Sequence, residues 1–386
     1  MTATGDLKLR AGAARDWLME ACFPLWAGRG VADGGFLEAL DLQHRSIDVA
    51  VGRVRVQARQ TYVFSEALRL GWQPRRSGEL VEMGVDVLAK ACCRPDGLFG
   101  RRVDLGRGAL EDDTADLYDT AFALYALASA SKLSSTQAGG ALKLGHVPDL
   151  ISHVSGALET VLKDPSGGYI ESLPRPEYRV QNPHMHLFEA SLELYGTSRD
   201  ASHLSRATAL HELFLARFFD RTSGTLSERF MPADWTLPIG DAGAIIEPGH
   251  QFEWVWLLDR FAVLTRGRLP DEARKLYELA CQTLDESGRA IQSCRRDGTP
   301  VDASRRTWPQ TEALKAHLTM WKGGDAAAAA RAAASFDVLM DEYLTPEGGW
   351  IDHFAADGRG IAKNMPASTG YHVVLAFVEL INAVGT

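Results

Sequence analysis

Apolar residues recur at helical spacing in about twelve segments of this chain, which predicts an all-α protein. The expected helices cover residues 6–28, 53–72, 77–93, 113–131, 146–163, 184–197, 203–219, 249–265, 270–287, 308–322, 326–343 and 370–383. The Ala-rich run from Asp325 to Ala334 is a strong helix former. It is therefore interpreted as part of the eleventh helix and not as a linker.

One type of turn recurs between the odd-numbered and even-numbered helices. Its first glycine stands at Gly34, Gly97, Gly167, Gly224, Gly288 and Gly348, so successive turns lie 57 to 70 residues apart. A repeat of this length holds two helices. Residues after the turns, such as 36–42 and 350–354, are suited to short hairpins. Six helical hairpins with one turn type at one end indicate an open superhelix or a closed toroid.

We expect the closed form, an (α/α)6 barrel in which residues 1–386 make up a single catalytic domain. No obvious polar capping repeat stands at either end, and the last helix, 370–383, is apolar enough to be internal. In such a barrel the even-numbered helices form the inner ring and all point the same way. Their N-terminal ends, together with short β-hairpin loops, then gather on one face, where the site is expected.

Composition and charge narrow the class of ligand. The formal net charge of the 386 residues is −9, and no basic stripe interleaved with aromatics occurs, so nucleic acid is not an expected partner. No apolar segment is long enough for a membrane span or a signal peptide, which predicts a cytoplasmic protein. The five cysteines form no CxxC pair, and dinucleotide, P-loop and hydrolase-elbow motifs do not occur. A small-molecule role, in a monomer or homodimer, fits best.

Every even-numbered helix carries polar or aromatic residues near its N-terminus. These candidates are Arg59, Tyr118, Asn182, His186, His250, Glu253, Trp308, Glu312 and His372. Each has a structural explanation when it is taken alone, such as an ion pair for the arginine, core packing for the aromatics, or contact with the helix dipole for Glu312. Their coincidence on one face of the predicted barrel indicates a functional site.

Two of these candidates, His250 and His372, are placed in the first turn of a helix. The macrodipole there opposes a positive ring, which favours neutral imidazole at physiological pH. We therefore expect His250 and His372 to act as an acid and base pair. Glu253, three residues after His250, is expected to orient that histidine through a hydrogen bond from the ring.

Three other functions remain open on these residues. A metal site would use the polar residues His184, His186, Glu189, His250 and Glu253, although His184 and His186 lie two apart and point to different faces of a helix. Glycoside hydrolysis would use Glu253 and Glu312 as paired carboxylates, but it needs fewer histidines than this face holds. A noncatalytic sugar-binding module would favour stacking aromatics over titratable groups.

Four motifs, NPHMHLFEA, EPGHQFEWVWLL, RRTWPQTEALKA and PASTGYH, occur in this order and resemble the N-acylglucosamine 2-epimerase family. The resemblance covers nearly the whole chain and implies an (α/α)6 barrel. It implies that Arg59, Tyr118, Asn182 and His186 hold the sugar and help to open its ring. It further implies that His250, supported by Glu253, and His372 are the catalytic pair, that Trp308 faces the sugar, and that Glu312 contacts the sugar or a catalytic histidine.

The resemblance also implies a reaction through a cis-enediolate, with neither metal nor cofactor. RRTWPQTEALKA is most similar to the motif of mannose isomerases, since cellobiose epimerases typically carry a Trp-Trp pair where this chain has Thr307 and Trp308. We therefore expect an isomerase that interconverts D-mannose and D-fructose. The alternatives are a 2-epimerase of the N-acylglucosamine or cellobiose type, and an isomerase of a 6-phosphorylated or 6-sulfonated hexose. An anionic substituent would meet Arg175, Arg179 and Arg305.

Overall fold

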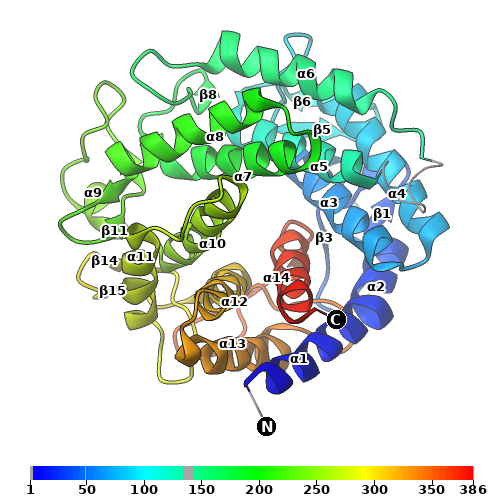
Figure 1. Ribbon diagram of the computed structural model, residues 1–386. Helices are drawn as coiled ribbons and strands as arrows, with labels where there is room; N and C mark the ends of the chain where they lie inside the picture. Colours follow the sequence, from blue (N-terminus) through cyan, green and yellow to red (C-terminus); the bar gives the residue numbers. More distant parts are fainter. Residues whose placement is uncertain (1–2, 48, 134–141, 386) are drawn as a thin grey trace.

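Two concentric rings of helices form a closed barrel in this protein, for which a computed structural model describes residues 3–47, 49–133 and 142–385 (Figure 1). The inner ring consists of α3 (Val54–Leu70), α5 (Leu117–Leu133), α7 (Gln181–Ser198), α10 (Pro248–Leu264), α12 (Thr307–Lys322) and α14 (Thr369–Val384). Each inner helix packs against the next, and α14 returns to contact α3. The predicted closed (α/α)6 barrel is therefore confirmed.

The outer ring supplies one helical segment for each inner helix. Its members are α1 (Ala3–Trp17) with α2 (Phe23–Arg29), α4 (Pro74–Val87), α6 (Val147–Ala157), α8 (Ala201–Leu213), α11 (Asp271–Gln282) and α13 (Ala326–Val338). π-Helical turns follow α1, α4, α6, α8 and α13, at Leu18–Cys22, Leu88–Cys92, Leu158–Leu162, Phe214–Phe218 and Leu339–Tyr343. A short helix, α9 (Asp241–Ala244), precedes α10. The twelve expected helical segments are present, and their ends differ from the prediction by only a few residues.

Local chemistry explains where several helices begin and end. The side chains of Asp200 and Asp325 accept hydrogen bonds from the first turns of α8 and α13, which satisfies backbone donors that have no partner within the helix. Pro248 occupies the first turn of α10, where a missing N–H costs nothing. Gly71 ends α3 with a left-handed backbone, φ +86°, that a side chain would strain.

Short strands occupy the loops on the face where the inner helices begin. They are β1 (Val31–Ala32), β2 (Gly35–Phe36), β3 (Ala39–Leu40), β4 (Val51–Arg53), β5 (Arg102–Asp104), β6 (Ala109–Asp112), β7 (Ala115–Asp116), β8 (Ser172–Leu173), β9 (Arg179–Val180), β10 (Phe219–Asp220), β11 (Thr225–Leu226), β12 (Arg229–Phe230), β13 (Ile245–Ile246), β14 (Ser293–Arg295), β15 (Pro300–Asp302), β16 (Arg305–Arg306), β17 (His353–Phe354) and β18 (Met365–Pro366). Four pairs, β1–β2, β5–β6, β10–β11 and β14–β15, are local hairpins of the expected kind.

Six other strand pairs connect neighbouring repeats. β4–β5, β7–β8, β9–β12, β13–β14, β16–β17 and β18–β3 each join the segment before one inner helix to the segment before the next. Segments 36–42 and 350–354, expected to form local hairpins, contribute β3 and β17 to this set. The isolated antiparallel bridges Leu40–Ser46 and Phe354–Gly360 also close local turns there. The pair β18–β3 joins the segment before the last inner helix to the segment before the first one. The strand pairs therefore form a closed ring around the barrel mouth.

Aromatic packing also joins the first and last repeats. The rings of Trp26 and Trp350 stack with centroids 4.5 Å apart and planes 9° from parallel. The indole N–H of Trp26 donates to the carbonyl oxygen of Gly348 at 3.2 Å, and α1 packs against α13 and α14. The N-terminal outer helices therefore complete the ring that the last hairpin leaves open.

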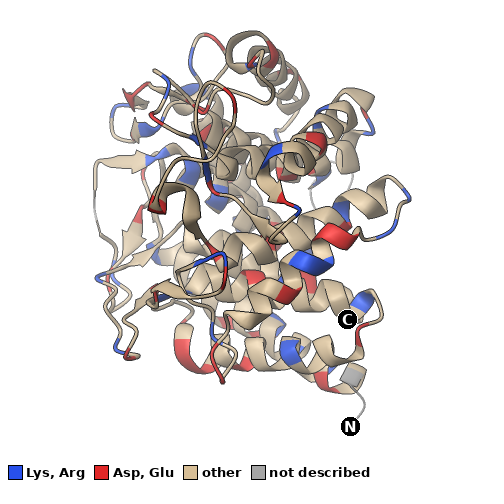
Figure 2. Ribbon diagram, turned by 90° about the vertical axis from the view of Figure 1, so that its left-hand side faces the viewer, with Lys and Arg blue, Asp and Glu red and all other residues tan. Residues whose placement is uncertain are grey.

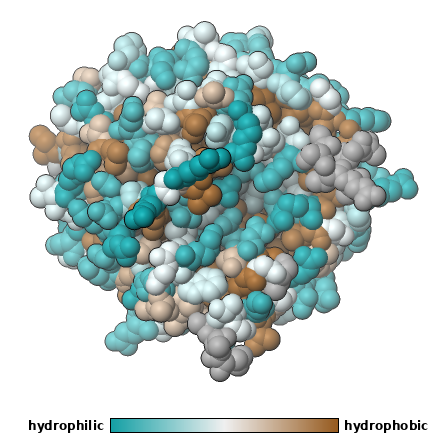
Figure 3. All heavy atoms as spheres, viewed as in Figure 1, coloured by the Kyte–Doolittle hydropathy of each residue, from teal (hydrophilic) through white to brown (hydrophobic). Residues whose placement is uncertain are grey.

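The outside of the barrel is mixed in character. Acidic and basic residues are both scattered over the ribbon in Figure 2. On the face seen in Figure 3, small clusters of apolar residues lie among hydrophilic ones. This mixture agrees with a sequence that contains no basic stripe. No helix within the described part of the chain is long and apolar enough to cross a membrane.

The close contact between Gly348 and the backbone of Ala21 predicts that an alanine is more destabilising at position 348 than at Gly288, the corresponding glycine of another repeat. Gly348 and Gly288 both have φ between +79° and +97°, but a Cβ at position 348 would overlap the backbone of Ala21, whereas a Cβ at position 288 meets nothing within 4 Å. We expect Gly288→Ala to lower the free energy of unfolding by about 1–2 kcal/mol through backbone strain alone. Gly348→Ala is expected to cost roughly 1–3 kcal/mol more through overpacking. Urea unfolding of both variants measures this difference, and equal losses would contradict it.

Candidate active site

A cavity of about 230 Å³ lies where the inner helices begin. It is lined by Arg59, Tyr118, Asn182, His186, Glu247, His250, Glu253, Trp308 and His372. Of the residues predicted for the site, only Glu312 is missing from this lining, because it is fully buried and bonded to the ring of His372. The structure therefore brings together residues from six different helices, as the sequence analysis expected.

Equivalent positions in the repeats explain this convergence. The second residue of three inner helices belongs to the site: Tyr118 in α5, Asn182 in α7 and Trp308 in α12. The sixth residue of four inner helices belongs to it as well: Arg59 in α3, His186 in α7, Glu253 in α10 and Glu312 in α12. Residues four apart share one face of a helix and differ in depth by about 6 Å. The inner ring therefore presents an outer layer of side chains near the mouth and a deeper layer below it.

His250 is held by carboxylates from the mouth of the barrel. Its Nδ1 lies 2.9 Å from Oε2 of Glu228 and 3.9 Å from Oε2 of Glu247. Burial lowers the pKa of His250, but these two carboxylates outweigh burial and raise it to about 10. The expectation of a neutral His250 is wrong, since two full charges within 4 Å exceed the partial charge of a helix end.

His372 has the opposite electrostatic environment. Its Nδ1 lies 2.8 Å from Oε1 of Glu312, and Oε2 of Glu312 lies 2.6 Å from the ammonium of Lys315. Burial, together with the positive charges of Arg59 and Lys315, lowers the pKa of His372 well below its ordinary value. His372 is therefore neutral at physiological pH. Because Nδ1 faces a carboxylate, we assign the ring proton to Nδ1, which leaves Nε2 able to accept a proton.

Glu253 does not orient His250, contrary to the sequence-based expectation. It lies deeper in the barrel, where its Oε1 is 3.9 Å from Nδ1 of His186 and has no hydrogen-bond partner among the described residues. Burial and the nearby charge of Glu312 raise the pKa of Glu253 well above its ordinary range. Glu253 therefore presents a neutral carboxyl group to the cavity.

Two polar groups in the lining have capacity left for a ligand. The amide oxygen of Asn182 is buried and accepts no hydrogen bond from any described residue. Arg59 donates to the hydroxyl of Tyr118 at 2.8 Å and to the carbonyl of Ser368 at 3.2 Å, but no ion pair to a described carboxylate is formed. Its guanidinium also lies 4.1 Å from the centre of the Phe122 ring. Because a buried polar group without a partner is costly, both groups are suited to binding a polar ligand.

His186 is fixed by a second hydrogen-bonded chain. Its Nδ1 lies 3.0 Å from Oε2 of Glu189, whose other oxygen accepts a hydrogen bond from the hydroxyl of Tyr371. Burial lowers the pKa of His186 to about 4, and the contact with His186 lowers the pKa of Glu189 despite its burial. The ring is therefore neutral, with its Nδ1 proton toward Glu189 and Nε2 available to the cavity.

Trp308 lies between the two histidines of the expected pair. Its ring centroid is 5.0 Å from that of His250 and 5.9 Å from that of His372. A ligand in the cavity therefore meets a protonated histidine and a neutral one on either side of a single apolar surface.

The buried carboxylates argue against two alternative chemistries. Two groups, His186–Glu189–Glu253 and Glu253–Glu312–His372, have ligand atoms close enough for a metal ion. The same three glutamates surround Lys315. Burial lowers the pKa of this lysine, but the glutamates outweigh burial and raise it, so a cation, the ammonium of Lys315, already lies among them. Glu312 also uses both oxygens within the protein, which leaves none for a glycosidic bond. His184, the other metal candidate, instead bonds to backbone groups of Tyr169 and Val180.

Three charged residues of this site were missed by the sequence analysis. Glu228 lies between β11 and β12, outside every helical motif, and no pattern in the sequence connects it to His250. Glu247 immediately precedes Pro248 in the motif that contains His250. Lys315 follows Glu312 by three residues, a helical spacing that could have been recognised as an ion pair.

Comparisons with known proteins show which family this chain belongs to. Residues 34–376 match the family model described as N-acylglucosamine 2-epimerase (GlcNAc 2-epimerase). The chain is 35% identical over 394 residues to a mannose-6-phosphate isomerase of Rhizobium meliloti, and the match covers 97% of each chain. It is 25% identical over 313 residues to a D-mannose isomerase of Marinomonas mediterranea, which covers 72% of this chain and 74% of that relative. The solved cellobiose 2-epimerase of Spirochaeta thermophila shares the fold with a TM-score of 0.86 and 24% identity, over 98% of this chain and 97% of that chain.

Glu228→Gln tests the cause of the charge on His250. The substitution keeps the side chain's shape but removes the carboxylate that favours the protonated ring. We expect the midpoint of the His250 titration, about 10 in the unaltered protein, to move to lower pH by roughly 1–3 pH units. Histidine NMR signals measured against pH report this midpoint, with the His250 signal identified by its loss in His250→Asn. Glu177→Gln, which removes an exposed carboxylate from a loop on the same face, should leave the midpoint in place.

Lys315→Met tests the buried cation. Methionine fills the space of the lysine stem but leaves the surrounding carboxylates uncompensated, so we expect the free energy of unfolding to fall by about 3–5 kcal/mol. The pKa of His372 should rise, because Lys315 is one of the charges that lower it. Denaturant unfolding and histidine NMR measure the two effects. Lys322→Met, at the exposed end of the same helix, should change stability by no more than about 0.5 kcal/mol.

Proposed function

Because this chain belongs to the N-acylglucosamine 2-epimerase family, we propose that it is an aldose–ketose isomerase that interconverts D-mannose and D-fructose. The observation that carries the proposal is the opposite protonation of two histidines around one cavity. His250 holds a proton, whereas His372 has a free ring nitrogen. A pocket of about 230 Å³ is small compared with the roughly 300–1,000 Å³ typical of ligand sites, which suits a single sugar.

The first step in this proposal opens the sugar ring. Nε2 of His186 takes the proton from the anomeric hydroxyl and delivers it to the ring oxygen as the bond between that oxygen and C1 breaks. The open-chain aldose results, and His186 returns to its neutral state. The free acceptor of Asn182 and the hydroxyl of Tyr118 hold sugar hydroxyls at the mouth side of the cavity. Glu253, as a neutral carboxyl, donates a hydrogen bond to a sugar oxygen in the deeper layer.

The second step moves hydrogen between C1 and C2. His372 removes the proton from C2, which is acidic because it adjoins the carbonyl, while His250 protonates the carbonyl oxygen O1. The intermediate is the cis-enediol, which keeps its proton on O2, and the guanidinium of Arg59 stabilises the negative charge that develops on its oxygens while the protons move. His250 then takes the proton from the O2 hydroxyl as the C2 carbonyl forms, and His372 returns its proton to C1. Both histidines regain their starting states, so the reaction is balanced.

Isomerisation and epimerisation differ in where the proton returns. Delivery to the opposite face of C2 by His250 would give the epimer instead of the ketose. Relatives of both kinds occur, and Thr307 favours the isomerase because it stands where a second tryptophan would stack another sugar. Thr307 is buried and its hydroxyl donates to the carbonyl of Ile351 at 3.2 Å, so it adds no surface to the cavity.

A phosphorylated hexose is the second candidate, because the relative that shares 35% identity is named a mannose-6-phosphate isomerase. The charges near the cavity favour the free sugar. A neighbouring hollow of about 400 Å³ is lined by Arg55, Arg101 and Arg229, of which Arg55 and Arg101 pair with Asp119 and Asp116 at 2.8 Å. Three glutamates, Glu171, Glu228 and Glu247, line the same hollow.

The three arginines that were expected to meet an anionic substituent also lie beside carboxylates of the protein. Arg175 and Arg179 pair with Asp164, and Arg179 is almost completely buried. Arg305 lies 3.7 Å from Glu342. Glu228 and Glu247 line the mouth as well, and their charges would repel a phosphate group.

Turnover in D2O distinguishes these reactions. Protein without added metal is incubated with D-mannose or D-mannose 6-phosphate, and the products are followed by NMR. We expect fructose labelled at C1 from free mannose, at a rate well above that from the phosphate. His372→Asn should lower the rate by roughly a hundredfold to ten-thousandfold. Glucose labelled at C2 as the main product would establish epimerisation, and turnover of the phosphate alone would establish the second candidate.

A further inference from the structure

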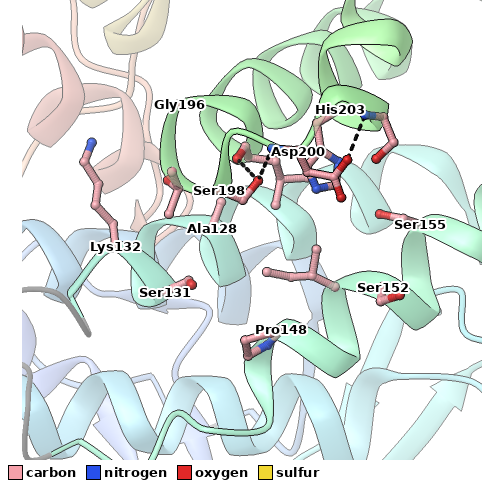
Figure 4. A pocket seen from close by; sticks show the side chains of 14 residues that line it. Ala128, Ser131, Lys132, Pro148, Ser152, Ser155, Gly196, Ser198, Asp200 and His203 are labelled. Carbon is pink, nitrogen blue, oxygen red and sulfur yellow. Dashed lines mark hydrogen bonds between the residues drawn. The ribbon is translucent and has the colours of Figure 1, made fainter.

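A second, larger cavity lies at the opposite end of the barrel from the catalytic cavity. Its volume is about 740 Å³, within the range of small-molecule sites. The C-terminal ends of α5 and α7, the length of α6 and the start of α8 surround it, and Figure 4 shows the hydroxyls of Ser131, Ser152, Ser155 and Ser198 around this space. Tyr118 and Ser131 lie 13 residues apart on α5, so the two cavities are separated by about 20 Å.

Buried polar atoms without partners point to a ligand in this cavity. Oγ of Ser155, Oγ1 of Thr197 and Nδ1 of His203 are buried and have no hydrogen-bond partner among the described residues. All three residues line the cavity, and His203 is only 5% exposed. Such atoms are rare in folded proteins because water or another group normally satisfies them. The three residues that carry them come from three different helices and line a single space.

The groups that face this cavity are uncharged or already paired. Burial and the neighbouring Arg206 lower the pKa of His203, so its ring is neutral at physiological pH. Asp200 accepts a hydrogen bond from the backbone N–H of Ser202 at 2.8 Å as the cap of α8. Lys132 lies 3.1 Å from Glu193. The carboxylate of Asp200 keeps its charge but is exposed to solvent, whereas the rest of the lining offers uncharged donors and acceptors that the hydroxyl groups of a ligand would satisfy.

One wall of the cavity is apolar and is formed by Ala128, Pro148, Ile151 and Leu194. A sugar or cyclic polyol combines hydroxyl groups with an apolar C–H face, which matches this division. We propose that the cavity between α5, α6, α7 and α8 is a second binding site for an uncharged polyhydroxylated molecule of monosaccharide size. The site is independent of the catalytic cavity, although α5 and α7 each contribute residues to both.

Binding of D-mannitol and myo-inositol tests this site, since neither contains a carbonyl group that the catalytic cavity could isomerise. The methyl signal of Ile151, identified by its loss in Ile151→Val, reports on the apolar wall by NMR. We expect this signal to shift saturably with at least one of the two polyols. If it does not move with either, water alone occupies the cavity and the proposal is wrong.

Three variants identify the origin of the shift. Ser155→Leu fills the cavity and should abolish it, whereas Thr197→Val removes one hydroxyl and should weaken binding by roughly twofold to tenfold. Ser205→Leu, an exposed position on α8 outside the lining, is the matched control and should bind as the unaltered protein does. Retained turnover of sugar in all three confirms folding. A shift that survives Ser155→Leu would assign the binding to another site and overturn the proposal.

Discussion

An inner helix of a closed barrel has no face in contact with water, and this constraint governs the polar residues of the whole molecule. α5, α7, α10, α12 and α14 are buried along most of their length. A charge on such a helix is costly unless an opposite charge or hydrogen-bond partners meet it. Lys315, entirely inaccessible to solvent, is surrounded by Glu312, Glu253 and Glu189 from three inner helices. These groups support the histidines that line the cavity.

The two histidines show how neighbours outweigh local position. His250 and His372 both lie in the first helical turn, so the helix dipole acts on them alike. Glu228 and Glu247 nevertheless favour the charged form of His250, whereas Arg59 and Lys315 favour the neutral form of His372. A residue pair of one chemical type thereby acquires the distinct acid and base roles that the proposed reaction needs. The difference arises from loops and helices far apart in the sequence.

The strand pairs around the mouth have a related role. Each pair connects the segments that precede adjacent inner helices, and the pair β18–β3 completes the circle. The loops that carry Glu228 and Glu247 are part of this ring, since β12 pairs with β9 and β13 pairs with β14. Main-chain hydrogen bonds between strands thus position the loops that carry these carboxylates, which favour the protonated form of His250. A loop without such bonds would position them less rigidly.

Helical periodicity and the recurring glycine turn were sufficient to predict twelve helices, their pairing and the face on which polar residues gather. These features are local, because spacing along a helix decides which side chains share a face. Sequence reasoning therefore selected nine candidate residues, eight of which line the cavity, and expected them to converge. It failed for Glu228, whose contact with His250 spans 22 residues of loop and strand, and for the direction of the charge on His250.

Only the tertiary structure decided which carboxylate meets which histidine. Glu253 follows His250 by three residues, yet the helix directs it about a turn deeper, toward His186 and Lys315. A pKa depends on every charge within a few ångströms in a medium of low dielectric, whatever the separation in sequence. The sequence by itself therefore determined the barrel and most of the residues that line the cavity, whereas the folded ring determined which carboxylates surround them and their protonation.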